Sequence, residues 1–344
     1  MIRKLIVLIV VVGTFLGFRN KGKELFSKPN NWPEPNYNFI SNPLSKAKIE
    51  LGKALFYDPL LSANNTISCA SCHSQYNAFA HADHALSHGI DDRIGTRNAP
   101  TLINLAWNKT FMWDGAIHHL DVQALAPISH HDEMDENIEN VVQKLMQSPI
   151  YPKLFKKAFP GEEISGANTL RSISSFLLTL VSNNSKYDSV MLGRTQFNYK
   201  EAKGYEVFKT HCSSCHTEPL FTNGGFENNG LPMDTELKDI GRMKITQNIK
   251  DSMLFKVPTL RNIEFSFPYM HDGRFTRLNE VINHYTVGIK PGKTLSTILQ
   301  QQIKITSDQK VELIAFLLTL TDKTFLFNPD YSYPKKTLNP KTKD

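Results

Sequence analysis

Apolar residues in this chain gather in short segments with helical spacing, and two of these segments occur twice. Gly52-Lys-Ala-Leu-Phe56 has a counterpart in Gly204-Tyr-Glu-Val-Phe208, and Phe176-Leu-Leu-Thr-Leu180 recurs unchanged as Phe316-Leu-Leu-Thr-Leu320, 140 residues later. Strand-like alternation of apolar and polar residues is scarce. The pattern predicts a mainly α fold with long loops, in which one unit is present in two copies.

The helical periodicity stops between the copies. Asn183 to Tyr199 is polar, which predicts a boundary near Arg194. We therefore expect one domain over 40–190 and a second over 195–325, each with a helix near its start and another at its end that pack across one another. A basic tail over 330–344 follows.

The chain begins with a charged and then apolar segment. Arg3 and Lys4 precede an apolar run from Leu5 to Phe18, which is typical of a secretory signal and short for a membrane span. No A-x-A-like cleavage site follows, so residues 1–20 are either a signal peptide or an uncleaved anchor. Both interpretations place the body outside the cytoplasm.

Composition and charge exclude several classes of protein. With 344 residues, 40% of them hydrophobic and 21% charged, the chain is an ordinary globular protein and is neither disordered nor collagen-like. Its formal charge is +6, but the first 28 residues carry +5 and the last ten carry +3, so the body between them is at −2. Because the body is not basic, we expect no nucleic-acid partner.

All four cysteines lie in two CxxCH motifs, which start 143 residues apart and therefore follow the same period as the helical segments. Two thiols about one helical turn apart can each bond to a haem vinyl group, and the adjacent histidine can then ligate the iron. The motifs predict two covalently bound haem c groups. Their residues are Cys69, Cys72 and His73 in the first copy and Cys212, Cys215 and His216 in the second.

CxxC pairs also form disulfides or bind zinc, and these alternatives stay open at this point. Either one has to explain why a histidine directly follows both pairs in an exported chain.

Four further motifs complete the pattern. They are Arg97-Asn-Ala-Pro-Thr101, Trp113-Asp-Gly115, Lys256-Val-Pro-Thr-Leu-Arg-Asn262 and Pro268-Tyr-Met-His-Asp-Gly273. Together with the CxxCH motifs, in this order and spacing, they resemble the bacterial di-haem cytochrome c peroxidase family, which includes the MauG-like enzymes. The resemblance covers about residues 40–325 and implies two cytochrome c-like haem domains in tandem.

The resemblance implies different tasks for the two haems. The N-terminal haem reduces hydrogen peroxide, and the C-terminal haem passes on electrons from a small cytochrome c or copper protein. It also implies a periplasmic enzyme, and we expect a homodimer. By position, His73 and His216 are the proximal iron ligands, and His88 is the distal histidine of the resting peroxidatic haem.

Further residues carry over by position. Trp113 matches the residue between the haems, and Gln123 and Glu133 match the pair over the peroxide pocket. A calcium ion is implied at Asn98 and at the carbonyls of Ser266 and Pro268.

The residue types of the pair make chemical sense. Cleavage of peroxide needs a group that moves a proton from the inner to the outer oxygen, which a carboxylate such as Glu133 can do. Gln123 cannot titrate, so we interpret it as a hydrogen-bonding partner.

One position departs from the family pattern. The peroxidases place a methionine ligand of the second haem in the helix after the Pro-Tyr-x-His-Asp-Gly motif, whereas this chain has Tyr285 there. Met270 is the alternative ligand. The sequence therefore favours a cytochrome c peroxidase and leaves two alternatives, a MauG-like oxidase that acts on a protein side chain through high-valent iron and a non-catalytic di-haem electron carrier.

Overall fold

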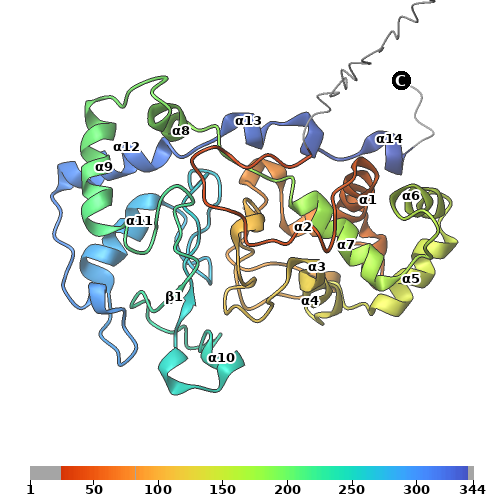
Figure 1. Cartoon of the computed structure of the whole chain (residues 1–344). Helices are drawn as coiled ribbons and strands as arrows, with labels where there is room; N and C mark the ends of the chain where they lie inside the picture. Colours follow the sequence, from red (N-terminus) through yellow and green to blue (C-terminus); the bar gives the residue numbers. More distant parts are fainter. Residues whose placement is uncertain (1–24, 82, 340–344) are drawn as a thin grey trace, which may run out of the picture.

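The computed structural model describes residues 25–81 and 83–339, and the segment predicted as a signal or anchor lies outside them. The fold is helix-rich with long loops, as predicted, and its sheet consists of two short strands (Figure 1). No helix within the described ranges is both long and apolar enough to cross a membrane.

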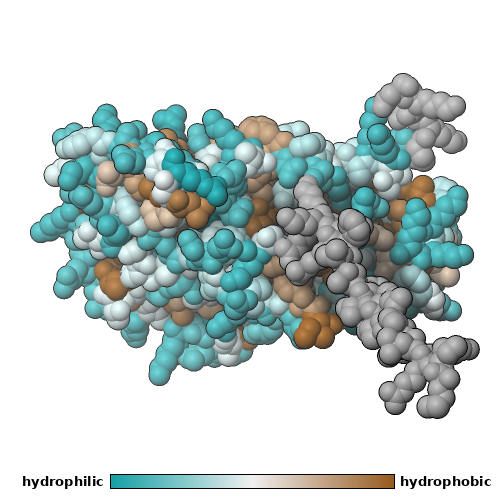
Figure 2. Space-filling view, turned by 45° about the horizontal axis from the view of Figure 1, so that its top comes forward, coloured by the Kyte–Doolittle hydropathy of each residue, from teal (hydrophilic) through white to brown (hydrophobic). Residues whose placement is uncertain are grey.

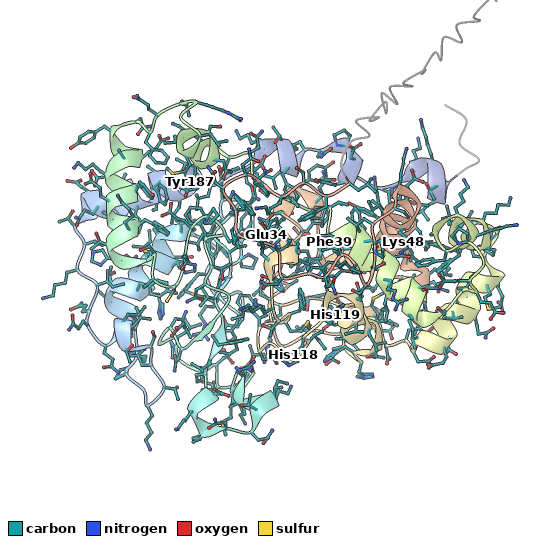
Figure 3. The ribbon with its side chains drawn as sticks, viewed as in Figure 1. Glu34, Phe39, Lys48, His118, His119 and Tyr187 are labelled. Carbon is teal, nitrogen blue, oxygen red and sulfur yellow. The ribbon has the colours of Figure 1, made fainter. Side chains whose placement is uncertain are left out.

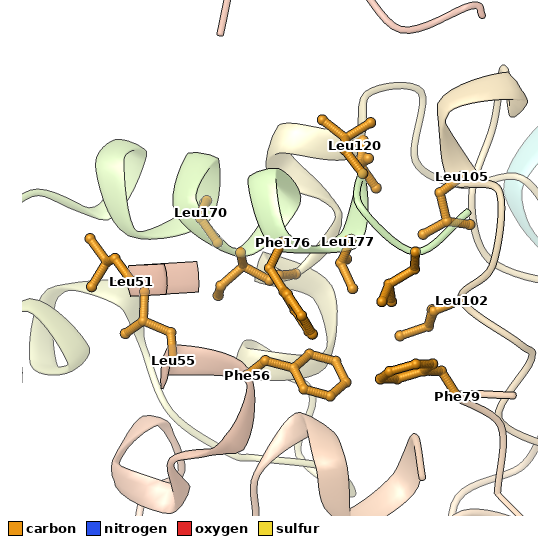
Figure 4. Packing of buried hydrophobic residues seen from close by; sticks show 14 of the residues in the cluster. Leu51, Leu55, Phe56, Phe79, Leu102, Leu105, Leu120, Leu170, Phe176 and Leu177 are labelled. Atoms are coloured by element: carbon orange, nitrogen blue, oxygen red, sulfur yellow. The ribbon is translucent and has the colours of Figure 1, made fainter. Parts of the chain in front are cut away.

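Two pairs of crossed helices form the frame. The first pair is α1 (Lys46–Tyr57) and α7 (Gly166–Leu177), which pack against each other. Side-chain caps define where both begin, since Ser45 accepts a hydrogen bond from the Lys48 amide and Ser165 accepts one from the Asn168 amide. Their apolar faces meet in a cluster that Figure 4 shows from close by, and labelled members include Leu51, Leu55, Phe56, Phe79 and Phe176.

The second pair repeats this arrangement with α9 (Tyr199–His211) and α12 (Ser307–Leu318). Both helices begin with a reciprocal capping box, formed by Asn198 with Glu201 and by Thr306 with Gln309. Phe208 and Phe316 are fully buried in a second, separate cluster. The two FLLTL segments predicted as core helices therefore occupy equivalent places.

Each crossing depends on a glycine. A Cβ atom on Gly52 would lie 1.8 Å from the Ser172 carbonyl oxygen of α7, and one on Gly204 would lie 1.9 Å from the Glu312 carbonyl oxygen of α12. Because no larger residue fits, the helix backbones approach closely in both copies.

Shorter elements fill in the two halves. In the N-terminal half these are α2 (Cys69–Cys72), α3 (Leu120–Gln123), α4 (Leu125–Ser129), α5 (Ile138–Gln147) and α6 (Tyr151–Ala158). The C-terminal half contains α8 (Lys186–Met191), α10 (Met243–Thr246), α11 (Leu278–Asn283) and the π-helical turn His284–Gly288. Strand β1 (Phe226–Glu227) pairs antiparallel with β2 (Phe255–Lys256), with Phe226 opposite Lys256.

A further repeat connects each CxxCH loop to its closing helix. Pro-Thr-Leu-x-Asn occurs at 100–104 and again at 258–262. Asn104 and Asn262 are both left-handed, with φ of 57° and 58°, and their amides donate to the carbonyls of Leu180 (2.8 Å) and Leu320 (3.1 Å). Asparagine tolerates this conformation well, so the two residues end equivalent loops in the same way.

Residues near the predicted domain boundaries pack in the hydrophobic cluster of the other half. Tyr187, expected in the N-terminal unit, packs in the second cluster, and Phe325 belongs to the first. In Figure 3, Tyr187 lies among the side chains around α9 and α12, and Lys48 lies on the other half of the molecule.

The segment predicted as a basic tail begins with a packed stretch. Helices α13 (Lys323–Leu326) and α14 (Lys335–Leu338) run along the upper edge of Figure 1 to α1. The Tyr331 hydroxyl donates a hydrogen bond to the Thr179 carbonyl (2.8 Å), and the Tyr331 carbonyl accepts one from the Tyr57 hydroxyl (2.7 Å). The C-terminal segment thus returns to the N-terminal half and connects it to α12.

Hydrophilic residues cover most of the face in Figure 2, with smaller hydrophobic groups between them.

Replacing Gly52 or Gly204 with alanine is expected to lower the free energy of unfolding by about 1–3 kcal/mol, since the added methyl group overpacks a backbone contact. Denaturant titration followed by far-UV circular dichroism measures this change. Gly292→Ala is the matched control, because a Cβ atom there has no neighbour within 4 Å. Equal stability of all three variants would show that the crossings tolerate separation.

Candidate haem-binding and catalytic sites

The first CxxCH motif forms a single helical turn. Helix α2 holds Cys69 and Cys72 on one turn, and Ser68 and Ser71 cap it reciprocally. Both thiols are free, and burial raises the pKa of Cys69 to about 12 and that of Cys72 to about 11. The two sulfurs are therefore kept protonated and unpaired at the edge of a cavity.

The alternatives for the cysteines find no support in the geometry. All four thiols are free, and the two pairs line different cavities, so no site can be made of all four. Within the described ranges, no three His, Cys, Asp or Glu side chains are grouped to hold a metal ion.

Both motif histidines are oriented by main-chain carbonyls. His73 Nδ1 lies 2.8 Å from the Phe79 carbonyl, and His216 Nδ1 lies 3.2 Å from the Phe221 carbonyl and 3.1 Å from that of Pro258. A carbonyl only accepts, so Nδ1 carries the proton. Burial lowers the pKa of His73 to about 4 and also lowers that of His216. Each imidazole is thus neutral with Nε2 left as a free electron-pair donor, which is the form that ligates haem iron.

The N-terminal cavity has a volume of about 50 Å³ and brings together six residues that the sequence singles out. They are Cys69, Cys72, His73, His88, Gln123 and Glu133. Phe56, Leu102, Met134, Ile173 and Leu177 supply apolar walls. Free thiols, a neutral histidine and apolar walls fit a covalently attached haem.

The loop that carries His88 is hydrogen-bonded to the loop that carries Glu133. The Ile90 amide donates to the Glu133 carbonyl at 2.7 Å, and a Cβ on Gly89 would lie 2.1 Å from the Asp132 carbonyl oxygen. His88 Nδ1 contacts Asp92 at 2.7 Å, and its ring stacks on His84 with centroids 4.3 Å apart. Both predicted side chains therefore reach one cavity from two loops that contact each other.

Glu133 and Gln123 differ in the chemistry that they can supply to this cavity. Burial raises the pKa of the Glu133 carboxyl group, and His130, whose Nδ1 lies 4.0 Å from Oε1, partly opposes this. A raised pKa suits a group that takes up and releases protons near neutral pH. Gln123, at the end of α3, places Nε2 3.7 Å from the Met112 sulfur.

The C-terminal cavity is larger, about 230 Å³, and mostly apolar. Cys212, Cys215 and His216 line it together with both candidate second ligands, Met270 and Tyr285. The Asn229 side-chain amide lies 3.5 Å from the sulfur of Met270 and 3.5 Å from the hydroxyl of Tyr285. Tyr285 sits in the π-helical turn, and burial raises its pKa to about 12.

Trp113 lines the C-terminal cavity, and its chain neighbour Met112 contacts Gln123 of the N-terminal cavity. The indole Nε1 donates to the Asn98 carbonyl at 2.8 Å. The residues predicted for calcium, Asn98, Ser266 and Pro268, line the same cavity.

A buried ion pair at this junction has no counterpart in the sequence interpretation. Arg97 binds Asp239 through two contacts of 2.6 and 2.9 Å and Asp114 at 2.7 Å. The charge of Arg97 lowers the pKa of Asp239, although burial opposes it. Arg97 and Asp114 stand in quoted motifs, but Asp239 lies in a loop that no motif marks. The repeated Pro-Thr-Leu-x-Asn, by contrast, was visible in the sequence and could have shown how the motif histidines are oriented.

Comparison with known proteins identifies the family of this chain. The family model for di-haem cytochrome c peroxidase matches residues 46–196. Methylamine utilization protein MauG of Methylorubrum extorquens is 35% identical over 310 residues, which cover 87% of this chain and 84% of that protein. The chain belongs to the di-haem cytochrome c peroxidase family.

A second relative and a solved structure also match this chain over both of its halves. Cytochrome c551 peroxidase of Nitrosomonas europaea is 35% identical over 299 residues, covering 83% of this chain and 82% of that protein. The crystal structure of a MauG-like protein associated with microbial copper homeostasis superposes with a TM-score of 0.83 at 32% identity, covering 89% of this chain and 98% of that one. The family is one of peroxidase oxidoreductases, and membership implies two haem c groups.

Each CxxCH motif is expected to attach one haem covalently. Haem staining of denaturing gels should show two haems in the parent chain and a loss in Cys69→Ala and in Cys212→Ala, because each change removes one thioether bond. A parent with fewer than two covalent haems, or a variant that keeps both with normal attachment, would refute the assignment.

Proposed function

We propose that this protein reduces hydrogen peroxide to water in the N-terminal cavity, with electrons from a small one-electron donor. The observation that carries the proposal is the convergence of His73, His88, Gln123 and Glu133 on one cavity. A pure electron carrier gains nothing from a carboxyl group with a raised pKa at that place. We also infer that the two hydrophobic clusters belong to two haem domains, of which the C-terminal one receives the electrons.

The overall reaction takes up two electrons and two protons for each peroxide and yields two waters. A haem bound by His73 supplies a site for peroxide and the electrons that cleave it. Glu133 would take the proton from the inner oxygen and give it to the outer one, which leaves as the first water when the O–O bond breaks. The two electrons and two protons of the overall reaction then convert the inner oxygen into the second water. Gln123 donates a hydrogen bond through its amide and orients the peroxide without titrating.

Glu133→Gln is expected to keep both haems and the fold but to lose about 100- to 10,000-fold in peroxide turnover, the usual contribution of a general acid–base group. The change keeps the size and polarity of the side chain and removes only its titration. Steady-state peroxide reduction with a reduced cytochrome c measures the effect. Glu139→Gln on the exposed side of α5 is the control, and turnover of the Glu133 variant within a few-fold of the parent would make Glu133 a loop carboxylate.

The pH profile gives an independent readout of the same residue. Glu133 must be ionised to accept the first proton, so turnover should fall as the pH drops through its pKa. Because burial raises that pKa, the acid limb is expected above the ordinary value for glutamate, about 4.3. The limb should be missing from the residual activity of Glu133→Gln.

A second candidate function is oxidation of a side chain of another protein, with peroxide as the oxidant. The observation that favours it is Tyr285, whose hydroxyl reaches the C-terminal cavity where the peroxidase pattern has methionine. A thioether ligand favours Fe(II) and raises the potential, whereas a phenolate favours Fe(III). Tyrosine ligation would make the C-terminal haem a poor electron store and better suited to share oxidising equivalents through Trp113.

Tyr285→Phe is expected to change the ferric spectrum of the C-terminal haem, since it removes the oxygen ligand and leaves the ring. Met270→Ala is the matched test of the sulfur. If the parent shows a methionine-sulfur charge-transfer band that survives in Tyr285→Phe and vanishes in Met270→Ala, Met270 is the ligand and the second candidate loses its support.

Three finer expectations stay predictions. A calcium site is supported by the fact that Asn98, Ser266 and Pro268 all line the C-terminal cavity. The side-chain nitrogen of Asn98 donates to the Ala85 carbonyl (3.2 Å), which leaves the side-chain oxygen of Asn98 available as a ligand. The periplasmic location rests on the N-terminal segment and the resemblance, and the homodimer rests on the resemblance.

A further inference from the structure

The C-terminal cavity has one strongly basic side chain among the described residues that line it. Its lining includes histidines and Glu227, but Lys256 is its one lysine or arginine. The lining of the N-terminal cavity includes neither. Haem carries two propionate carboxylates, so charge complementarity points to Lys256.

Lys256 is fixed in place by the main chain. It lies on β2 opposite Phe226, and its amide donates to the Trp113 carbonyl at 2.7 Å. Its ammonium group donates to the Thr110 carbonyl at 2.8 Å and to the Thr110 hydroxyl at 3.3 Å. These contacts hold the charge at the junction of the two halves, beside the Trp113 segment.

The contacts of Lys256 leave its charge without an anionic partner, although its ammonium nitrogen lies over the Phe226 ring, 5.8 Å from the ring centre. No carboxylate among the described residues lies within ion-pair distance of its ammonium group, and both acceptors are neutral. The charged neighbour that affects it is Arg242, which has the same sign. Together with burial, Arg242 lowers the pKa of Lys256 to about 8. Lys256 is partly buried, and a charge removed from water is unfavourable unless it is paired, so this environment lacks an anion.

We propose that Lys256 is the counter-ion of a propionate carboxylate of the haem in the C-terminal cavity and raises the reduction potential of that haem. The inference rests on the two-haem assignment and is independent of the peroxidase activity. An ammonium has three donors, and two directions are taken by Thr110, so one is left for a carboxylate oxygen.

The repeat shows that this charge is a feature of one copy. Aligning the two Pro-Thr-Leu-x-Asn segments puts Asn98 at the position of Lys256. Asn98 lines the same cavity but is neutral. At this position, therefore, the duplicated unit carries a positive charge in one copy only.

The test compares Lys256→Met and Lys256→Arg with the parent holoprotein in a buffer free of carboxylates. Haem staining first establishes that both haems are attached. Spectroelectrochemical titration without peroxide or donor then measures both midpoint potentials. Lys256→Met should lower the potential of the C-terminal haem, because removing a positive charge stabilises the oxidised state, and Lys256→Arg should restore it. Lys53→Met is the matched control, because Lys53 also donates to a main-chain carbonyl, that of Asp330, and lines neither cavity.

A crystal structure of the holoprotein provides the direct measurement. A propionate oxygen is expected within about 3.2 Å of the Lys256 ammonium nitrogen. An unchanged potential in Lys256→Met, or a holoprotein in which both propionates of that haem lie elsewhere, would overturn the proposal and leave Lys256 as a tie to Thr110. Failure of peroxide turnover would not change either result, so the two proposals fail separately.

Discussion

The hydrogen bond from the motif histidine to a main-chain carbonyl is the constraint on which the other features depend. In both copies Nδ1 faces the carbonyl of a buried phenylalanine, Phe79 or Phe221. Such a bond fixes the tautomer and the ring orientation, which direct Nε2 toward the iron. The loop after each CxxCH motif must therefore stay in register with the helix that carries the cysteines.

The duplicated frame keeps that register. Gly52 and Gly204 let the helix before each motif approach its crossing partner closely. Thr101 and Thr259 then bind carbonyls of the loops after the motifs, at Ala78 and Leu220, while Asn104 and Asn262 bind the ends of the closing helices. The same path of hydrogen bonds thus connects helix, loop and histidine in each copy.

On this common frame the two cavities differ in polar groups. The N-terminal cavity has a carboxyl group and an amide beside its histidine and no fixed cation in its described lining. The C-terminal cavity has a phenol, a thioether and Lys256, together with the carboxyl group of Glu227 and the amides of Asn98 and Asn229. Arg97 joins Asp114 of the N-terminal half to Asp239 of the C-terminal half, and the Trp113 indole donates to the Asn98 carbonyl.

The sequence by itself determined the mainly α class, the duplication, the haem attachment residues and the family, because CxxCH spacing and helical periodicity are local properties of the chain. It also gave the chemistry expected of Glu133 and Gln123, but only tertiary structure brought them into the cavity of His73, since they come from different loops. The return of the C-terminal segment to α1, the pairing of Arg97 with Asp239 and the isolation of Lys256 were likewise decided by packing. Each depends on which distant segments meet, and local patterns carry no information about burial or counter-charges across such contacts.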